Sequence, residues 1–434
     1  MFSPRPGSRA VLPSRVDVVI VGAGAAGLAA ARRLRDAPLT VLVLEARDRI
    51  GGRAWTRPLQ GWPQDLGCGW LHSADRNVWA DLVEPMGFTL DKTPPPWSGQ
   101  AGDQDFEPEE QDGFNAAYDA LDRRIADAAK APQDRSASEL MEPGGRWNPL
   151  IDAISSFYNG VEYAKVSVKD YAAYVDTEVN WRVQEGYGAL VAAYGAEAPV
   201  ALGCVVEEID RRGAELRMTT SLGELVADRA IIAVPSAVLA EERLKLTPAV
   251  PEVLDAAAGL PLGLADKLVL ACSEPDLFPK DSQLLGRSDT TETGGYHLRP
   301  FGRPLIEGFF GGETARTLEG EGAAGMAHFA IEELANLVGT SMRRKLEPLH
   351  ATAWGADPFA RGSYSYAMPG RHEARAALGR PVEDRLFFAG EHCHSTFFST
   401  AHGAFETGVA AADAVLRACN LPVPEPALAE AEGR

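Results

Sequence analysis

Long apolar runs are missing from this sequence. No stretch of about 18 consecutive apolar residues occurs in its 434 residues, which argues against a transmembrane helix. Residues 1–15 contain neither an apolar signal-peptide core nor a twin arginine, so we expect a loose N-terminal tail that does not direct secretion. These absences favour a cytoplasmic protein that does not associate with membranes.

Cysteine is scarce and basic residues are outnumbered. The five cysteines are odd in number and lack metal-site spacing, which predicts reduced thiols. The 42 Lys and Arg against 61 Asp and Glu leave a net charge of −19. This charge disfavours nucleic acid and anionic membranes and would attract cationic substrates, although acidity for solubility alone is the stronger explanation. The length predicts two domains.

A glycine motif follows the first apolar run. Residues 16–21 lead into Gly22-Ala-Gly24-Ala-Ala-Gly27, and a second apolar run ends at Glu45, eighteen residues after Gly27. Gly22 makes the tight turn, Gly24 lets backbone amides approach a pyrophosphate, and Gly27 lets helix and strand pack closely. The helix N-terminus at Ala25 favours the phosphate, and Glu45 can accept from the ribose hydroxyls. The pattern predicts a dinucleotide site.

The next residues indicate which dinucleotide binds. Arg47 taken alone is compatible with the 2′-phosphate of NADP. The continuation Arg47-x-Arg49-x-Gly51-Gly52-Arg53 resembles the glutathione-reductase-type FAD fingerprint of the flavin amine oxidases. This resemblance implies that the second glycine pair and Arg53 hold the pyrophosphate and the flavin edge. We therefore expect FAD.

The resemblance to flavin amine oxidases extends over essentially the whole chain. Five further segments carry it: 65–72, 186–190, 265–269, 354–366 and 389–404. It implies an α/β fold, in which a Rossmann-like FAD-binding domain accompanies a discontinuous α+β substrate-binding domain. We expect the FAD domain to comprise residues 1–92, 196–258 and 380–434, and the substrate domain residues 93–195 and 259–379. The Pro- and acid-rich stretch 94–110 marks a crossing between them.

Local patterns predict individual elements. Phe114, Tyr118, Leu121 and Ile125 recur at helical spacing, so a helix is expected at about 113–130. Strands are expected at 200–202, 204–206, 214–218, 229–234, 267–271, 305–311 and 385–391, and helices near 325–338 and at 403–416.

The resemblance implies a set of catalytic residues. Lys267 matches the lysine that holds a water against flavin N5, whereas a lysine in an apolar strand is otherwise a snorkelling surface residue. Trp354 and Tyr364 match the aromatic side chains beside flavin and amine, although Trp354 also fits a core position. Tyr366 is expected to pack. His72 matches a histidine that faces the substrate tunnel, with a satisfied core histidine as the alternative. Thr400, at the position of the second cage aromatic of monoamine oxidases, completes the catalytic set.

Cofactor contacts are also implied by the resemblance. The helix after His402 points its N-terminus at the flavin, Glu391 contacts the ribityl or pyrophosphate region, and the Val206 backbone meets adenine. Because His392-Cys393-His394 lies in this flavin-contacting loop, we expect no metal there. The full set is Gly22, Gly24, Ala26, Gly27, Glu45, Ala46, Arg47, Gly52, Arg53, Gly69, Trp70, Val206, Pro235, Trp354, Gly390, Glu391, Thr400 and Ala401.

The implied reaction is oxidative deamination. Hydride passes from the α-carbon of a neutral amine to flavin N5, the imine is released and hydrolysed, and O₂ reoxidises the flavin to give H₂O₂; the protein supplies binding and electrostatics. A flavin dehydrogenase or desaturase with another acceptor is one alternative, which Lys267 disfavours. A catalytically silent flavin protein is another, which the intact catalytic set disfavours. We expect a monomer or homodimer that binds an amine and O₂.

Departures from other branches of the family indicate the substrate. Ser363 replaces the cysteine that tethers flavin in monoamine oxidases, so FAD is expected to be non-covalent. Thr400 replaces their second cage aromatic, and Trp70 stands where L-amino-acid oxidases place a carboxylate-binding arginine. The chain has no room for the coiled-coil insertion of histone demethylases. A polyamine or a related secondary or aliphatic amine is therefore favoured, with monoamine or L-amino-acid oxidation as alternatives.

Overall fold

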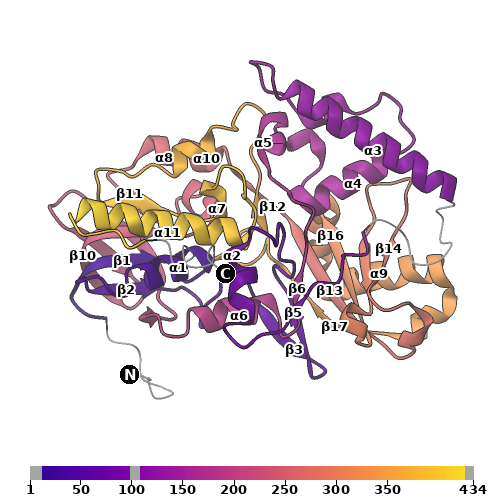
Figure 1. Cartoon of the computed structure of the whole chain (residues 1–434), viewed down its shortest axis with the longest axis horizontal. Coiled ribbons are helices and arrows are strands. Elements are labelled where there is room, and N and C mark those ends of the chain that lie inside the picture. Colours follow the sequence, from indigo (N-terminus) through magenta and orange to yellow (C-terminus); the bar gives the residue numbers. More distant parts are fainter. Residues whose placement is uncertain (1–11, 98–107, 426–434) are drawn as a thin grey trace, which may run out of the picture.

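Two β-sheets organise the molecule, each with its own helices (Figure 1). The computed structural model describes residues 12–97 and 108–425. The larger sheet has eight strands in the order β11-β8-β9-β10-β1-β2-β7, with β19 also paired to β10. Its strands are β1 (Arg15–Val21), β2 (Val41–Leu44), β7 (Val200–Ala201), β8 (Val206–Asp210), β9 (Leu216–Thr220), β10 (Gly223–Ile232), β11 (Lys245–Thr247) and β19 (Leu386–Phe388).

Strand β1 is apolar on both faces because helices cover both. Val18 and Ile20 pack on one side, whereas Val19 and Val21 pack on the other. The first side carries α1 (Ala25–Arg33), α2 (Val78–Val83), α6 (Tyr187–Tyr194) and α11 (Ala401–Ala418), and the second carries α7 (Ser236–Ala240), α8 (Pro251–Ala258) and α10 (Ala374–Leu378). This near-continuous apolar pattern is typical of a parallel sheet buried on both faces.

The larger sheet joins segments that are far apart in the chain. Strand β1 lies parallel between β2 and β10, and β10 also pairs in parallel with β19. The carboxyl ends of these strands therefore meet at one edge, which is where ligands bind in open α/β sheets.

The second sheet has five antiparallel strands in the order β14-β15-β16-β13-β17. They are β13 (Ala265–Cys272), β14 (Ser282–Leu285), β15 (Gly295–Leu298), β16 (Leu305–Gly311) and β17 (Leu346–Ala351), and α9 (Gly312–Val338) covers one face. Leu268 and Leu270 face α9, whereas Val269 packs against Leu66 on the other face. Because strand side chains alternate, Lys267 also lies on the face away from α9.

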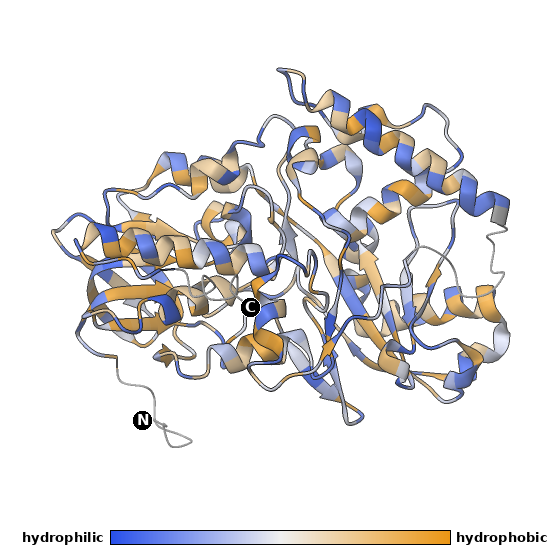
Figure 2. Ribbon diagram, viewed as in Figure 1, coloured by the Kyte–Doolittle hydropathy of each residue, from blue (hydrophilic) through white to orange (hydrophobic). Residues whose placement is uncertain are grey.

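A helical cluster lies beyond this sheet, formed by α3 (Pro108–Ala128), α4 (Asn148–Asn159) and α5 (Val168–Ala173). Figure 2 shows mixed blue and orange turns along α3, as in an amphipathic helix. Three small ribbons complete the fold: β3 (Thr56–Leu59) with β4 (Trp62–Asp65), β5 (Leu90–Asp91) with β6 (Arg182–Val183), and β12 (Leu262–Gly263) with β18 (Tyr364–Ser365).

Most predicted elements are present, with shifted ends. Strand β8 begins at Val206, so the prediction that Cys204 lies in a strand was wrong. Helix α9 begins at Gly312, earlier than predicted, and breaks at Gly322, whose φ is 78°. Residues 1–11 of the predicted tail and residues 98–107 of the predicted crossing lie outside the described residues. All five cysteines are free thiols, and no described helix has the length and apolarity to span a membrane.

Candidate active site

One large cavity connects the edge of the first sheet with the helical cluster. Its volume is about 1410 Å³, and it extends from the glycine motif after β1 to the side chains of α3, α4 and α5. Sites for one small molecule commonly occupy about 300–1,000 Å³. The cavity is therefore large enough for a dinucleotide together with a second molecule.

The presence of glycine at each of the three positions of the first motif has a different geometric explanation. Gly22 has a φ of +102°, and a Cβ there would lie 2.7 Å from the carbonyl oxygen of Ala233. A Cβ on Gly27 would lie 1.9 Å from the carbonyl oxygen of Gly22, so α1 can pack this closely only with glycine. A Cβ on Gly24 would meet nothing within 4 Å and would occupy the cavity instead. This open space lies at the uncapped N-terminus of α1, which suits a pyrophosphate.

Glu45 and Arg47 lie beside this motif. Glu45 is buried, and its carboxylate accepts hydrogen bonds from the Ala23 N–H at 2.8 Å and the Arg47 N–H at 2.9 Å. The Arg47 guanidinium pairs with Asp357 at 2.7 Å. Because a carboxylate already neutralises Arg47, the geometry does not favour the NADP alternative.

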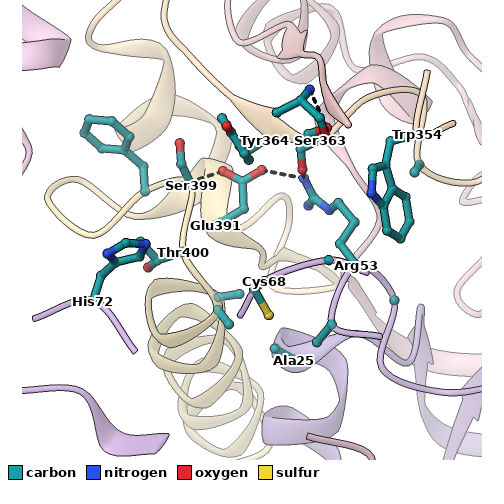
Figure 3. Close-up of a pocket in the computed structure, with 18 of the residues that line it drawn as sticks. Ala25, Arg53, Cys68, His72, Trp354, Ser363, Tyr364, Glu391, Ser399 and Thr400 are labelled. Atoms are coloured by element: carbon teal, nitrogen blue, oxygen red, sulfur yellow. Dashed lines mark hydrogen bonds and ion pairs between the residues drawn. The ribbon is translucent and has the colours of Figure 1, made fainter. Parts of the chain in front are cut away.

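The second glycine pair brings Arg53 to the cavity. Gly52 has a φ of +58°, and a Cβ there would lie 3.2 Å from Gly24 Cα. Arg53 Nη1 donates to the Ser363 carbonyl oxygen at 2.7 Å and to Glu391 at 3.0 Å. Figure 3 shows Glu391 between Arg53 and Ser399.

Glu391 is engaged by protein donors on both oxygens. Besides Arg53, it accepts from the N–H and the hydroxyl of Ser365 at 3.2 and 2.6 Å, and from the Ser399 N–H at 3.0 Å. Burial alone would raise the pKa of Glu391, but the Arg53 and His392 charges and the Ser365 hydrogen bond outweigh it and lower the pKa to about 2. The carboxylate is therefore an anion that holds the loop before α11.

Unpartnered nitrogens in the cavity suit a polar cofactor. His392 is 1% exposed and lines the cavity, yet neither of its ring nitrogens has a partner among the described residues. His402 Nε2, in α11, likewise has no hydrogen-bond partner among the described residues. Together with the open space at Gly24, these groups fit FAD, whose phosphates and ring heteroatoms can accept or donate hydrogen bonds. No metal-binding group of His, Cys, Asp or Glu occurs within the described ranges.

Nearly every predicted site residue lies around this cavity. Only Gly27 does not line it, because it packs beneath Gly22. The residues that line it are Gly22, Gly24, Ala26, Glu45, Ala46, Arg47, Gly52, Arg53, Gly69, Trp70, His72, Val206, Pro235, Lys267, Trp354, Tyr364, Gly390, Glu391, Thr400 and Ala401. The fold thus brings residues from both sheets together.

Lys267 is buried, so the surface-lysine alternative was wrong. Its side chain is 8% exposed, and Nζ donates to the Asp65 carbonyl oxygen at 3.0 Å and pairs with Glu307 at 2.9 Å. A Cβ added to Gly69, which also lines the cavity, would lie 3.4 Å from Nζ. The ammonium therefore lies at the cavity surface.

The two predicted aromatic residues are held rigidly. Trp354 belongs to the core beneath the second sheet and also lines the cavity; its Nε1 donates to the Leu66 carbonyl oxygen at 3.2 Å. The Tyr364 hydroxyl donates to the Phe157 carbonyl oxygen, and burial raises the pKa of Tyr364. Tyr366 packs in the helical cluster, as predicted.

Trp70 and His72 follow β4 and line the cavity together. Trp70 stacks on His297 with ring centroids 6.0 Å apart, and Arg182 lies over it at 4.9 Å. His72 Nδ1 donates to the Asn180 side-chain oxygen at 2.7 Å. Burial lowers the pKa of His72, so the imidazole is neutral near pH 7.

Thr400 performs a structural task at the start of α11. Its hydroxyl donates to the Phe397 carbonyl oxygen at 2.6 Å and accepts from the Gly403 N–H at 3.0 Å, which caps the helix. The preceding Ser399 has a φ of 64°, a left-handed conformation that is rare outside glycine. The cap directs the N-terminus of α11 at the cavity.

Sequence reasoning missed the far part of the cavity, which we call the outer arm. Its described lining includes Tyr118, Asp122, Tyr158, Tyr171, Tyr174, Asp176 and Glu178, with no Lys or Arg. Glu307 near Lys267 was missed too. Glu307 could have been found as the single acid in the apolar strand Leu305–Gly311. The outer arm has no such sequence signal, because its side chains come from three separate helices and loops.

Comparison with known proteins places the chain in a family. A family model described as flavin containing amine oxidoreductase matches residues 25–416. Polyamine oxidase 2 of Arabidopsis thaliana is 30% identical, over 92% of this chain and 87% of that protein. Polyamine oxidase 3 of Oryza sativa subsp. japonica is 29% identical, over 92% and 88%.

Solved structures show the same fold. A putrescine oxidase variant has a TM-score of 0.76 at 21% identity, covering 93% of this chain and 99% of that chain. Cyclohexylamine oxidase from Brevibacterium oxydans has a TM-score of 0.73 at 23% identity, with the same coverage. These likenesses confirm the predicted α/β FAD-binding fold. With the FAD cradle and the matched family model, they identify the chain as an FAD-dependent member of the flavin-containing amine oxidoreductases.

Proposed function

We propose that this protein oxidises a polyamine or a related secondary or aliphatic amine and passes the electrons to O₂, with formation of H₂O₂. The observation that carries the substrate class is the charge of the outer arm. Three carboxylates line it, from Asp122, Asp176 and Glu178, and none of its described lining residues is Lys or Arg. Such an arm attracts a cation and orients a chain with more than one ammonium.

Asp122 strengthens this proposal. Its Oδ1 is buried without a hydrogen-bond partner among the described residues. Burial and the neighbouring Asp119 raise the pKa of Asp122, while Tyr171 opposes them. A substrate ammonium would pair with the Asp122 carboxylate and offset the cost of its burial, because a buried charge is costly unless it is paired.

Each proposed catalytic residue has a task that its contacts permit. When bound, FAD supplies the hydride acceptor and the electron carrier to O₂. Lys267 places an ammonium at the cavity surface, and Trp354 and Tyr364 exclude water and orient the amine. His72 is neutral and held by Asn180, so it can accept a hydrogen bond from an amine through Nε2. Thr400 caps α11, whose N-terminus favours negative charge.

We also propose the domain division predicted above, with the larger sheet in the FAD domain and the second sheet in the substrate domain. The five free thiols support a reducing compartment and hence the cytoplasm. Limited proteolysis would test the division, and cell fractionation would test the location.

A coupled peroxide assay tests the function. The holoenzyme is offered spermidine, N-acetylspermine, putrescine and n-butylamine at equal concentration. Peroxide formation with a higher kcat/KM for the polyamines than for n-butylamine is expected. Flavin reduction without peroxide would instead indicate a dehydrogenase, and no flavin reduction by any amine would contradict the proposal.

A further inference from the structure

Glu307 and the Asp65 carbonyl oxygen together fix the Lys267 ammonium. An ammonium has three N–H donors. Glu307 Oε1 lies 2.9 Å from Nζ, and the Asp65 carbonyl oxygen lies 3.0 Å from it. Two donors are thereby occupied, and tetrahedral geometry fixes the direction of the third. Nζ itself lies at the cavity surface beside Gly69.

Glu307 is fixed in turn by Gln64. Gln64 Nε2 donates to Glu307 Oε2 at 2.6 Å, so each carboxylate oxygen has its own partner. Gln64 is 5% exposed and immediately precedes Asp65 in β4. Strand β4 therefore holds Lys267 directly through a backbone carbonyl and indirectly through Gln64 and Glu307.

The pair is also electrically balanced. The Lys267 and Glu307 side chains are 8% and 15% exposed, so water screens their charges weakly. Asp65, whose carbonyl oxygen accepts from Lys267, carries a second carboxyl group; burial raises its pKa, whereas hydrogen bonds from Thr56 and two backbone amides and the Lys267 charge oppose the rise. Burial likewise raises the pKa of the nearby Cys68 thiol. Glu307 is the carboxylate whose oxygen contacts the ammonium directly, at 2.9 Å.

We propose that Glu307 is a positioning residue for amine oxidation, which aims the third N–H of Lys267 into the cavity and offsets its charge beside the flavin. The inference rests on the proposed catalytic role of Lys267. Glu307 acts through Lys267, and Gln64 acts through Glu307.

Two Glu307 variants separate charge from position in the holoenzyme. Glu307→Gln removes the negative charge, so kcat/KM should fall at least about tenfold (1.36 kcal/mol of transition-state stabilisation). The midpoint potential of bound FAD, measured without turnover, should become more positive because the ammonium is no longer offset. Glu307→Asp keeps the charge but shortens the reach, so it should lower kcat/KM while leaving the potential close to that of the wild type.

A matched control is available in the same sheet. Glu347 is exposed on β17, so Glu347→Gln should change neither kcat/KM nor the potential. Gln64→Leu leaves Glu307 in place but frees one of its oxygens, and should lower kcat/KM by roughly twofold to fivefold, less than Glu307→Gln. If Glu307→Gln does not retain FAD, Gln64→Leu and Glu307→Asp still test the proposal; wild-type rates in both would overturn it.

A double variant tests whether Glu307 acts through Lys267. In Lys267→Met the pair is already broken, so adding Glu307→Gln should cause no further loss in kcat/KM. Independent, additive losses would overturn the inference, as would a wild-type potential in Glu307→Gln. Inactivity of the wild type towards every amine would instead contradict the proposed function, so the two failures are distinguishable.

Discussion

Arg53 Nη1 and Glu391 Oε1 lie 3.0 Å apart and form an ion pair between a half-buried arginine and a buried glutamate, although 338 residues separate them in the chain. The Ser365 hydroxyl donates to Glu391 and accepts from Arg375. The Arg375 guanidinium in turn donates two hydrogen bonds to the Asp170 carboxylate, at 2.6 and 2.8 Å. This chain of polar contacts, whose Arg53–Glu391 end is drawn in Figure 3, connects the dinucleotide fingerprint with α5, whose Tyr171 lines the outer arm. One polar network therefore links the glycine-motif end of the cavity with the helix that contributes to the outer arm.

Glu391→Gln should destabilise the protein and weaken FAD binding. It leaves the Arg53 charge without its partner; because Arg53 is 24% exposed, the cost should not exceed the lower end of the about 3–5 kcal/mol of a fully buried pair. Thermal unfolding with and without added FAD measures the effect. Glu406→Gln, which removes a half-exposed carboxylate from the same region, is the control and should shift the midpoint little.

The same pair predicts a pH dependence. The pKa of Glu391 is about 2 in the folded protein and about 4.3 in the unfolded chain. Ionised Glu391 therefore stabilises the fold, and the full stabilisation is present when the pH is above the unfolded pKa. This contribution, about 3 kcal/mol, should be lost as the pH falls from about 5 towards 2. The difference in stability between wild type and Glu391→Gln should shrink over this range. If the difference in stability between the two proteins stayed constant over this pH range, the predicted pH dependence would be wrong.

Arg375→Met should be among the most damaging substitutions outside the cavity. Arg375 is 2% exposed, and its loss leaves Asp170 buried and unpaired, at a cost of about 3–5 kcal/mol. Arg371→Met removes an exposed pair with Asp255 and should cost at most about 1 kcal/mol. Urea denaturation of both variants compares them; equal midpoints would refute this ranking.

Lys267→Met should retain FAD but turn over at least about tenfold more slowly, a loss of about 1.4 kcal/mol in transition-state stabilisation. Stopped-flow reduction and oxygen consumption would measure it. Lys280→Met alters a lysine whose side chain is 62% exposed and should behave like the wild type. Normal turnover in Lys267→Met would make Lys267 an ordinary structural lysine.

The purified protein should be yellow, with about one FAD per chain released by acid precipitation. Ser363 stands where a tethering cysteine would be, and its hydroxyl exchanges hydrogen bonds with the Ala265 backbone at 2.7 and 2.8 Å. Flavin should appear in the supernatant. A yellow pellet would reveal a covalent bond and refute this prediction.

L-Leucine should be a poorer substrate than spermidine. Trp70 cannot neutralise a carboxylate, and the nearby Arg182 is already paired with Asp91 and Asp281 at 2.7 and 2.8 Å. A buried, unpaired carboxylate costs about 3–5 kcal/mol, which is more than about a hundredfold in affinity. Competing kcat/KM measurements would decide. If L-leucine turned over faster than every amine that lacks a carboxylate, the proposed substrate class would be wrong, but the proposal of a flavin oxidase would stand.

The sequence alone determined the parts of the site that are local in the chain. The turn at Gly22 and the start of α1 lie within one strand-turn-helix unit, so their geometry follows from a few neighbouring residues. The apolar strands β13 and β16 were predictable for the same reason, because a short apolar run is a local property of the sequence. Lys267 became a candidate only through the resemblance to a family.

Only the tertiary structure decided which distant groups meet. Lys267 and Glu307 lie on two paired strands, and Arg53 and Glu391 lie near opposite ends of the chain. Sequence spacing cannot identify such partners, because the packing of sheets and helices sets their distance and burial. The acidic outer arm is of this kind too: its carboxylates share no motif and form one surface only when α3 and the segment after α5 enclose the same cavity.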